Sequence, residues 1–222
     1  IAAVRDGHRP RAGEPLSSYA DIVTLINNQN STAVSYGRRL STPLLTDLLE
    51  ITGRWVSELV AALDPHELAD ISVAWAGEEV SENWMDIGRE YTERWHHQMQ
   101  IRDAVGRPGS LLEQRWVLPL LDLSVRAFPR AYDGVTADIG AAIVFEVEAD
   151  SNCVWTVIRD DGGWQLYRGR ATKPAATVRI DADAAWRLLY NALSTNAATA
   201  RISVSGDPAL AQPMLNARSV MV

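Results

Sequence analysis

The hydrophobic pattern of this 222-residue chain changes its period once, near residue 135. Between about residues 16 and 106, apolar residues recur every three or four positions, which is the period of an α-helix. After Tyr132-Asp133-Gly134 they alternate with polar residues, which is the period of a β-strand. The chain therefore predicts an α+β protein, with a helical domain over 1–135 and a small α+β domain over 136–222.

Four helices are expected in the first domain. Ser41-Thr42-Pro43 is typical of a helix start, because serine caps the free N–H groups and proline needs no N–H at the first helical position. Gly106-Arg107-Pro108-Gly109 is typical of a helix end. We expect Pro119 and Pro129 to kink or end the last helix. The expected helices cover residues 18–35, 41–63, 78–105 and 110–131.

The second domain is expected to begin with strands and to end with helices. Asp160-Asp161-Gly162-Gly163 predicts a tight hairpin turn, because glycine adopts the positive φ that such turns require. The expected strands are 141–148, 153–159, 163–168, 176–180 and 202–204. The expected helices are 181–193 and a final one that starts at Asp207 or Pro208.

Composition and charge exclude several classes of function. The chain has 21 basic and 28 acidic residues, and its net charge of −7 opposes binding to nucleic acid or to an anionic membrane. Apolar runs such as 139–145 are far shorter than the roughly 18 residues that a membrane span needs. The single cysteine, Cys153, excludes an internal disulfide and has apolar neighbours that favour an inert, buried thiol. Without an export signal, a cytoplasmic location is expected.

Glu93 and His97 are the candidate metal ligands. They are four residues apart on a predicted helix, so their side chains lie on one face and one ion can reach both. A carboxylate and a neutral imidazole suit Zn²⁺ or a similar divalent cation, although a catalytic zinc usually has three protein ligands. Spacing alone favours the simpler alternative, which is a solvated contact between the two side chains. The face predicted to be buried lies on the other side of the helix and consists of Trp84, Ile87, Tyr91, Trp95 and Met99.

The other histidines have weaker claims to a site. His96 is adjacent to the predicted buried face and is expected to be packed or hydrogen bonded. His66 follows Asp64-Pro65 and is expected at the surface near a helix start, and His8 is expected in a loop. No phosphate-binding loop, serine-hydrolase elbow or cluster of cysteine ligands is present in the sequence.

Residues 90–108, with the sequence EYTERWHHQMQIRDAVGRP, resemble the Glu-x-x-x-His…Gly-x-Pro helix of the mycothiol-dependent maleylpyruvate isomerase family. This family is part of the DinB-like metalloenzyme superfamily. Residues 25–30 and 38–41 are also similar to members of the family. Residues 186–189 and 204–211 are similar to parts of its sterol-carrier-like C-terminal domain.

The resemblance implies a DinB-like four-helix bundle that holds a divalent metal, usually zinc, with Glu93 and His97 as two of the ligands. A low-molecular-weight thiol, in this family mycothiol, is then the co-substrate, because a metal-bound thiol loses its proton easily and becomes a nucleophile. The implied function is a metal-dependent transferase or isomerase that acts on an electrophilic small molecule.

The resemblance also implies that one or more N-terminal helices are lacking. The family's third ligand is a histidine on an earlier helix, and residues 1–6 resemble the end of that helix. Gln100 is three residues after His97, at the position where relatives often carry an aspartate that supports the ligand histidine.

Two alternatives stay open at this stage. In the first, the protein binds or senses a small molecule without catalysis, in a pocket lined by aromatic residues that include Trp84, Tyr91, Trp95 and Trp116. In the second, the chain is an incomplete gene product, and a bundle face exposed by the missing helix drives self-association.

Overall fold

The structure is a computed structural model that describes residue 6 and residues 19–69, 80–148 and 153–219. The described residues form two compact units, one made by 19–69 with 82–87 and the other made mainly by 88–219. Each unit is described by itself. An N-terminal helical region and a C-terminal domain with a β-sheet confirm the predicted α+β class.

The first unit contains α2 (Tyr19–Gly37), α3 (Thr42–Ala62) and the first turn of α4 (Asn83–Ala104). The start of α3 is as predicted, because the Ser41 side chain accepts a hydrogen bond from the Leu44 amide and Pro43 lies in the first turn. The Asn83 side chain donates to the Asp64 carbonyl at 2.8 Å, and an isolated bridge joins Leu68 to Glu82. These bonds fix the N-terminus of α4 against the turn after α3.

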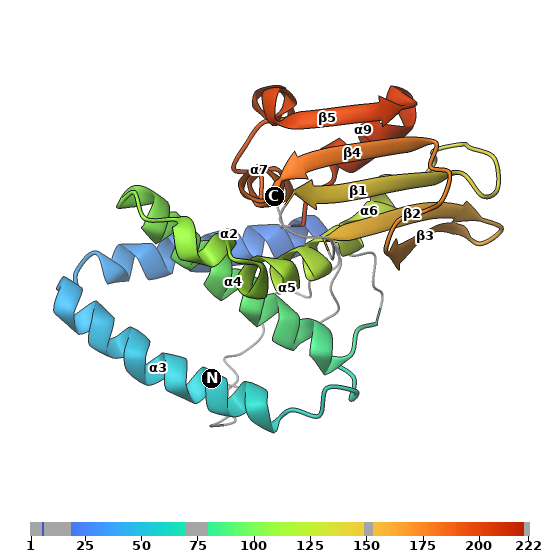
Figure 1. Cartoon of the computed structure of the whole chain (residues 1–222). Helices are drawn as coiled ribbons and strands as arrows, with labels where there is room; N and C mark the ends of the chain where they lie inside the picture. Colours follow the sequence, from blue (N-terminus) through green and yellow to red (C-terminus); the bar gives the residue numbers. More distant parts are fainter. Residues whose placement is uncertain (1–5, 7–18, 70–79, 149–152, 220–222) are drawn as a thin grey trace. The chain divides into compact units, whose positions relative to one another are not determined.

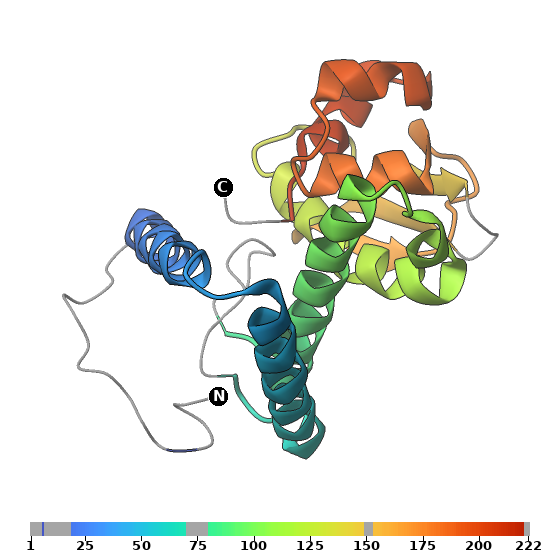
Figure 2. The ribbon, with the colours of Figure 1, turned by 90° about the vertical axis from the view of Figure 1, so that its left-hand side faces the viewer.

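α4 belongs to both units, since the division falls between Ile87 and Gly88. Figure 2 shows it as one uninterrupted helix. It begins at Asn83, whereas we predicted a start at residue 78; residues 78 and 79 lie outside the described ranges. The division within α4 comes earlier in the chain than the predicted domain boundary after residue 135.

The predicted helix over 110–131 is a series of shorter pieces. A 3₁₀ turn, Gly109–Leu112, is followed by α5 (Gln114–Ser124), another 3₁₀ turn and α6 (Phe128–Ala131). Pro119 lies inside α5 without ending it. Pro129 lies in the first turn of α6, where the missing N–H has no helical partner to lose.

The second unit contains a five-stranded sheet with the strand order β3-β2-β1-β4-β5 (Figure 1). The strands are β1 (Ala142–Glu148), β2 (Val154–Asp160), β3 (Gly163–Arg168), β4 (Ala176–Asp181) and β5 (Ile202–Gly206). β1 pairs with β4 in parallel, and all other neighbours are antiparallel. The predicted hairpin is confirmed, since Asp160 pairs with Gly163 and the Asp160 carboxylate accepts a hydrogen bond from the Gly162 amide.

Helices follow β4 and β5. α7 (Ala182–Leu189) is capped by Asp181, whose carboxylate accepts from the Ala184 amide. It ends before the predicted residue 193, because Asn191 adopts the left-handed conformation with φ of 55°. The short helix α8 (Thr195–Ala198) precedes β5, and α9 (Pro208–Asn216) is the predicted final helix.

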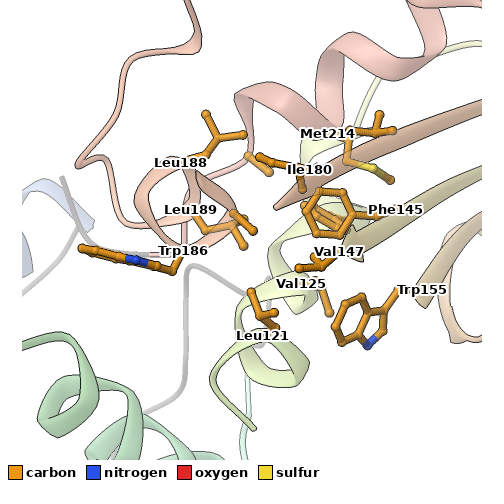
Figure 3. Close-up of a cluster of buried hydrophobic side chains, with 14 of the residues drawn as sticks. Leu121, Val125, Phe145, Val147, Trp155, Ile180, Trp186, Leu188, Leu189 and Met214 are labelled. Atoms are coloured by element: carbon orange, nitrogen blue, oxygen red, sulfur yellow. The ribbon is translucent and has the colours of Figure 1, made fainter. Parts of the chain in front are cut away.

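One face of the sheet carries the hydrophobic core. Ile143, Phe145 and Val147 alternate along β1 and are buried on this face. Side chains from α5, α6, α7 and α9 pack in the same cluster, and Figure 3 shows part of it. Trp95 and Met99 of α4 also belong to this cluster, which explains why most of α4 folds with the sheet. Cys153 is buried, as predicted.

The connection from β3 to β4 follows the other face of the sheet. The Thr156 side chain donates to the Gly169 carbonyl and accepts from the Ala171 amide. Further along, Arg170 is paired with Glu146, which also binds Arg179. The pKa of Glu146 lies below its usual value, because these arginines outweigh the effect of burial, which by itself raises it.

Candidate functional site

The structure places Glu93 and His97 together on one face of α4, as the spacing predicts. The His97 Nε2 and Glu93 Oε2 atoms are 3.3 Å apart. About two thirds of the His97 side chain and half of the Glu93 side chain are exposed to solvent. A soluble ion or small molecule can therefore reach both groups.

The His97 ring also contacts Gln100 on the same helix. The His97 Nδ1 atom lies 2.9 Å from the Gln100 Oε1 atom. Because an amide oxygen only accepts hydrogen bonds, Nδ1 carries the proton in this arrangement. In neutral His97, the lone pair on Nε2 then faces a carboxylate oxygen that is also an acceptor. Both atoms are of the kinds that bind Zn²⁺ in proteins.

A third metal ligand is not found near this pair in the part of the chain that the structure describes. Among those residues, no three His, Cys, Asp or Glu side chains come close enough to hold one ion. His96 stacks on His97 with ring centres 5.4 Å apart, but it also contacts the rings of Tyr190 and Trp186. Burial, with a smaller effect of His97, lowers the pKa of His96. This confirms the prediction that His96 is a packed histidine.

The predicted buried face of α4 is confirmed at its C-terminal end. Trp95 and Met99 are buried, and the Trp95 indole N–H donates to the Leu111 carbonyl. Tyr91 is half-buried, and its hydroxyl donates to the Trp116 carbonyl at 2.6 Å. The Trp116 side chain is exposed, so it is not a core residue.

The remaining histidine predictions have simple outcomes. His66 is exposed, as predicted, and its Nδ1 atom lies 3.2 Å from the Glu82 Oε2 atom. It lies in a turn rather than at a helix start. His8 lies outside the described residues.

A charged network at the N-terminus of α7 was not predicted from the sequence. Arg187 binds Asp183 on its own helix and Asp103 at the end of α4. Arg201 in turn binds Asp183 and Asp181. Burial by itself raises the pKa of Asp183, but hydrogen bonds from Arg187, Arg201 and the Trp186 indole outweigh this effect and hold it below its usual value. The only sequence signal was the four-residue spacing of Asp183 and Arg187.

The Asp183→Asn variant is expected to make the stability less dependent on acid pH. A carboxyl group whose pKa is lowered by folding stabilises the fold at pH values above the usual pKa of an aspartate, which is near 4. This stabilisation is lost as the pH falls through the lower pKa of the folded state. We expect the substitution to lower the free energy of unfolding by about 1–2 kcal/mol at pH 7 and by less at pH 3. Urea titrations at several pH values measure this. An equal loss at both pH values, or a similar profile for the exposed control Asp161→Asn, contradicts the prediction.

Comparison with known proteins reveals only distant similarity. No protein family and no curated protein matches the chain. Sterol carrier protein 2 like 2 from Aedes aegypti aligns with 46% of this chain and 95% of its own, at 18% identity and a TM-score of 0.35. The sterol carrier protein domain 2 of Helicoverpa armigera aligns with 41% of this chain and 82% of its own, at 18% identity and a TM-score of 0.32. UbiJ-SCP2, a ubiquinone synthesis protein, aligns with 39% of this chain and 73% of its own, at 17% identity and a TM-score of 0.30. Similarity at this level carries no information about ligand or activity.

Within the ranges described, none of the helices combines the length and apolar character that crossing a membrane requires.

Proposed function

We propose that the chain is a metal-dependent transferase or isomerase that uses a low-molecular-weight thiol such as mycothiol, with Glu93 and His97 as two of the metal ligands. The observation that supports this is the pair of acceptor atoms on α4, 3.3 Å apart, with the His97 ring held by Gln100. The resemblance of residues 90–108 to the maleylpyruvate isomerase family supplies the reaction class. A DinB-like four-helix bundle and a sterol-carrier-like C-terminal domain are part of the same proposal.

The residues fit a divalent metal in chemistry but do not complete its shell. A carboxylate oxygen and an imidazole nitrogen are zinc ligands, and a catalytic zinc takes three protein ligands and keeps one position open. A third ligand has to come from outside the described residues. When bound, the metal lowers the pKa of a coordinated thiol and so supplies a thiolate nucleophile. The role of Gln100 is to keep the proton on Nδ1, which leaves Nε2 free to bind.

A zinc titration of the full chain tests this proposal. We expect Glu93→Gln and His97→Ala each to weaken zinc binding by at least about tenfold, because either one removes one of the two proposed ligands. Gln100→Ala is expected to weaken binding by about tenfold, which is at the lower end for a group that orients a ligand. Isothermal titration calorimetry, with bound zinc checked by elemental analysis, gives these affinities.

His66→Ala is the matched control, because it removes an exposed imidazole that also lies beside a glutamate. It is expected to leave zinc binding unchanged. Equal zinc binding by the wild type, Glu93→Gln and His97→Ala defeats the proposal and favours the alternative, a non-catalytic small-molecule-binding or sensing protein.

Three predictions about location, partners and self-association accompany this proposal. They are a cytoplasmic location, partners limited to a small thiol and an electrophilic substrate, and self-association through an exposed bundle face. Sedimentation at several protein concentrations examines the last of these.

A further inference from the structure

β5 is at one edge of the five-stranded sheet, and this edge is open (Figure 1). Among the residues described, β5 pairs only with β4, and the residues from Ser203 to Gly206 are exposed. In the same part of the chain, no backbone group of 202–206 makes a hydrogen bond outside the sheet. Because the backbone groups of a strand point alternately to its two sides, every second residue of β5 presents its N–H and C=O groups to solvent.

β5 lacks the features that usually protect an exposed strand edge. Lysine, proline and bulges are common means by which proteins stop an edge from pairing with another chain. The sequence of β5, Ile-Ser-Val-Ser-Gly, contains no charged residue and no proline. Its pairing with β4 is regular over all of 202–206, so no bulge bends the strand away from its neighbour. The edge is therefore suited to accept a further strand.

β5 is complementary to itself in one antiparallel register, which is centred on Val204. In this register Val204 faces Val204 of a second copy, and Ser203 faces Ser205, so that all residues of 202–206 have a partner. Pairs of β-branched residues and pairs of hydroxyl groups are favourable across two strands. Registers centred on Ser203 or Ser205 leave part of the strand without a partner.

The side chain at the centre of this register is an apolar group with surface left to cover. Val204 is opposite Val178 of β4, whose side chain is buried in the core, so Val204 lies on the core face of the sheet. It is nevertheless 40% exposed. The same side chain of a second copy, placed beside it, covers part of this apolar surface.

The charges that flank β5 favour the same register. Arg201 precedes the strand and Asp207 follows it, and each is three positions from Val204. The register centred on Val204 therefore places Arg201 of each copy opposite Asp207 of the other. Arg201 also binds Asp181 and Asp183, and Asp207 caps α9, so the new contact adds to existing ones. Opposite charges that meet across an interface help to fix its register.

We propose that two copies of this chain join through their β5 strands, antiparallel to each other, about a two-fold axis at Val204. The two five-stranded sheets then form one continuous sheet. A five-residue strand makes a small interface, so the dimer is weak and its population rises with protein concentration. This interface belongs to the second unit, and it depends neither on the proposed metal site nor on self-association of the helices in the first unit.

Sedimentation velocity of the full chain over a wide range of concentrations measures this dimer. Val204→Lys and Val204→Glu each place a like charge opposite itself at the axis, and each is expected to weaken dimerisation by at least about tenfold. An equal mixture of the two variants brings opposite charges together at the same position and should recover dimers. This recovery requires folded variants, so it separates a lost interface from a lost fold.

Leu49→Lys is the matched control, because it places the same charge on a side chain of the first unit that is 70% exposed. It should leave the β5 dimer unchanged. A dimer that is weakened by Leu49→Lys and not by Val204→Lys is formed by the helices of the first unit, and that result contradicts the proposal.

A short bismaleimide crosslinker tests the register. Val204→Cys is expected to give a crosslinked dimer on a denaturing gel, because the position faces itself across the axis. The native Cys153 is buried and should not react. Ile139→Cys provides the control at a position of the second unit that is 70% exposed and outside β5, and it should remain monomeric on the gel.

Three further results overturn the proposal. The first is a monomer at all protein concentrations up to millimolar. The second is a mixture of Val204→Lys and Val204→Glu that dimerises no better than either variant alone. The third is equal crosslinking of Val204→Cys and Ile139→Cys.

Discussion

Trp186→Ala is expected to lower the free energy of unfolding by about 3–5 kcal/mol, as is typical when a large aromatic side chain is removed from a core. Trp186 is 1% exposed and meets the Trp95 ring edge to face, with centres 5.5 Å apart. Its indole N–H also donates to Asp183, and the Arg187 guanidinium lies 4.5 Å from its ring centre. The substitution therefore opens a cavity and takes one donor from the charged network at the same time.

Trp116→Ala is the matched control, because Trp116 is 42% exposed and lies in the same unit. We expect a loss of less than about 1 kcal/mol for it. Trp186→Phe should fall between the two, since it keeps most of the ring volume but loses the indole donor. Chemical unfolding followed by circular dichroism measures all three variants. Similar losses for Trp186→Ala and Trp116→Ala are incompatible with a core that depends on Trp186.

Gly206→Ala is expected to have the second large effect. Gly206 ends β5 with φ of +86°, a conformation that costs other residues about 1–2 kcal/mol. An added Cβ atom would also lie 2.1 Å from the Ala175 carbonyl oxygen, which accepts a hydrogen bond from the Asp207 amide. Since a backbone atom cannot rotate away, relief of this clash adds about 1–3 kcal/mol. We therefore expect a total loss of about 2–5 kcal/mol.

Gly169→Ala separates the two contributions to this loss. Gly169 also has a positive φ, of +99°, but a Cβ atom added there would meet no atom within 4 Å beyond its immediate chain neighbours. It should lose only the conformational part, about 1–2 kcal/mol. Thermal and urea unfolding of both variants gives the comparison. Equal losses at the two positions would show that the contact with Ala175 is relieved without cost.

The period of the hydrophobic residues was enough to predict most elements of the fold. It gave α2, α3, the first four strands and the final helix close to their observed positions. It did not show that the region after Gly109 consists of several short helices, because their apolar residues keep a helical period across the breaks. The sequence also could not show that α4 packs with the sheet, since contacts such as those of Trp95 with Trp186 join residues far apart in the chain.

The candidate site was predictable only in part. The four-residue spacing of Glu93 and His97 required that they share a face of the helix, and the structure confirms it. The bond between His97 and Gln100 depends on side-chain rotamers, and a three-residue spacing does not specify them.

The strand order has a consequence for how the sheet assembles. β1, β2 and β3 follow one another in the chain through short connections and pair as neighbours. The parallel pairing of β1 with β4 requires a longer connection, because the chain crosses β2 and β1 between the end of β3 and the start of β4. Closing a longer loop loses more chain entropy, so the three-stranded meander is expected to form before β4 docks. Kinetic φ-values near zero for Val178 in β4, beside higher values for Val157 in β2, are the signature of this order.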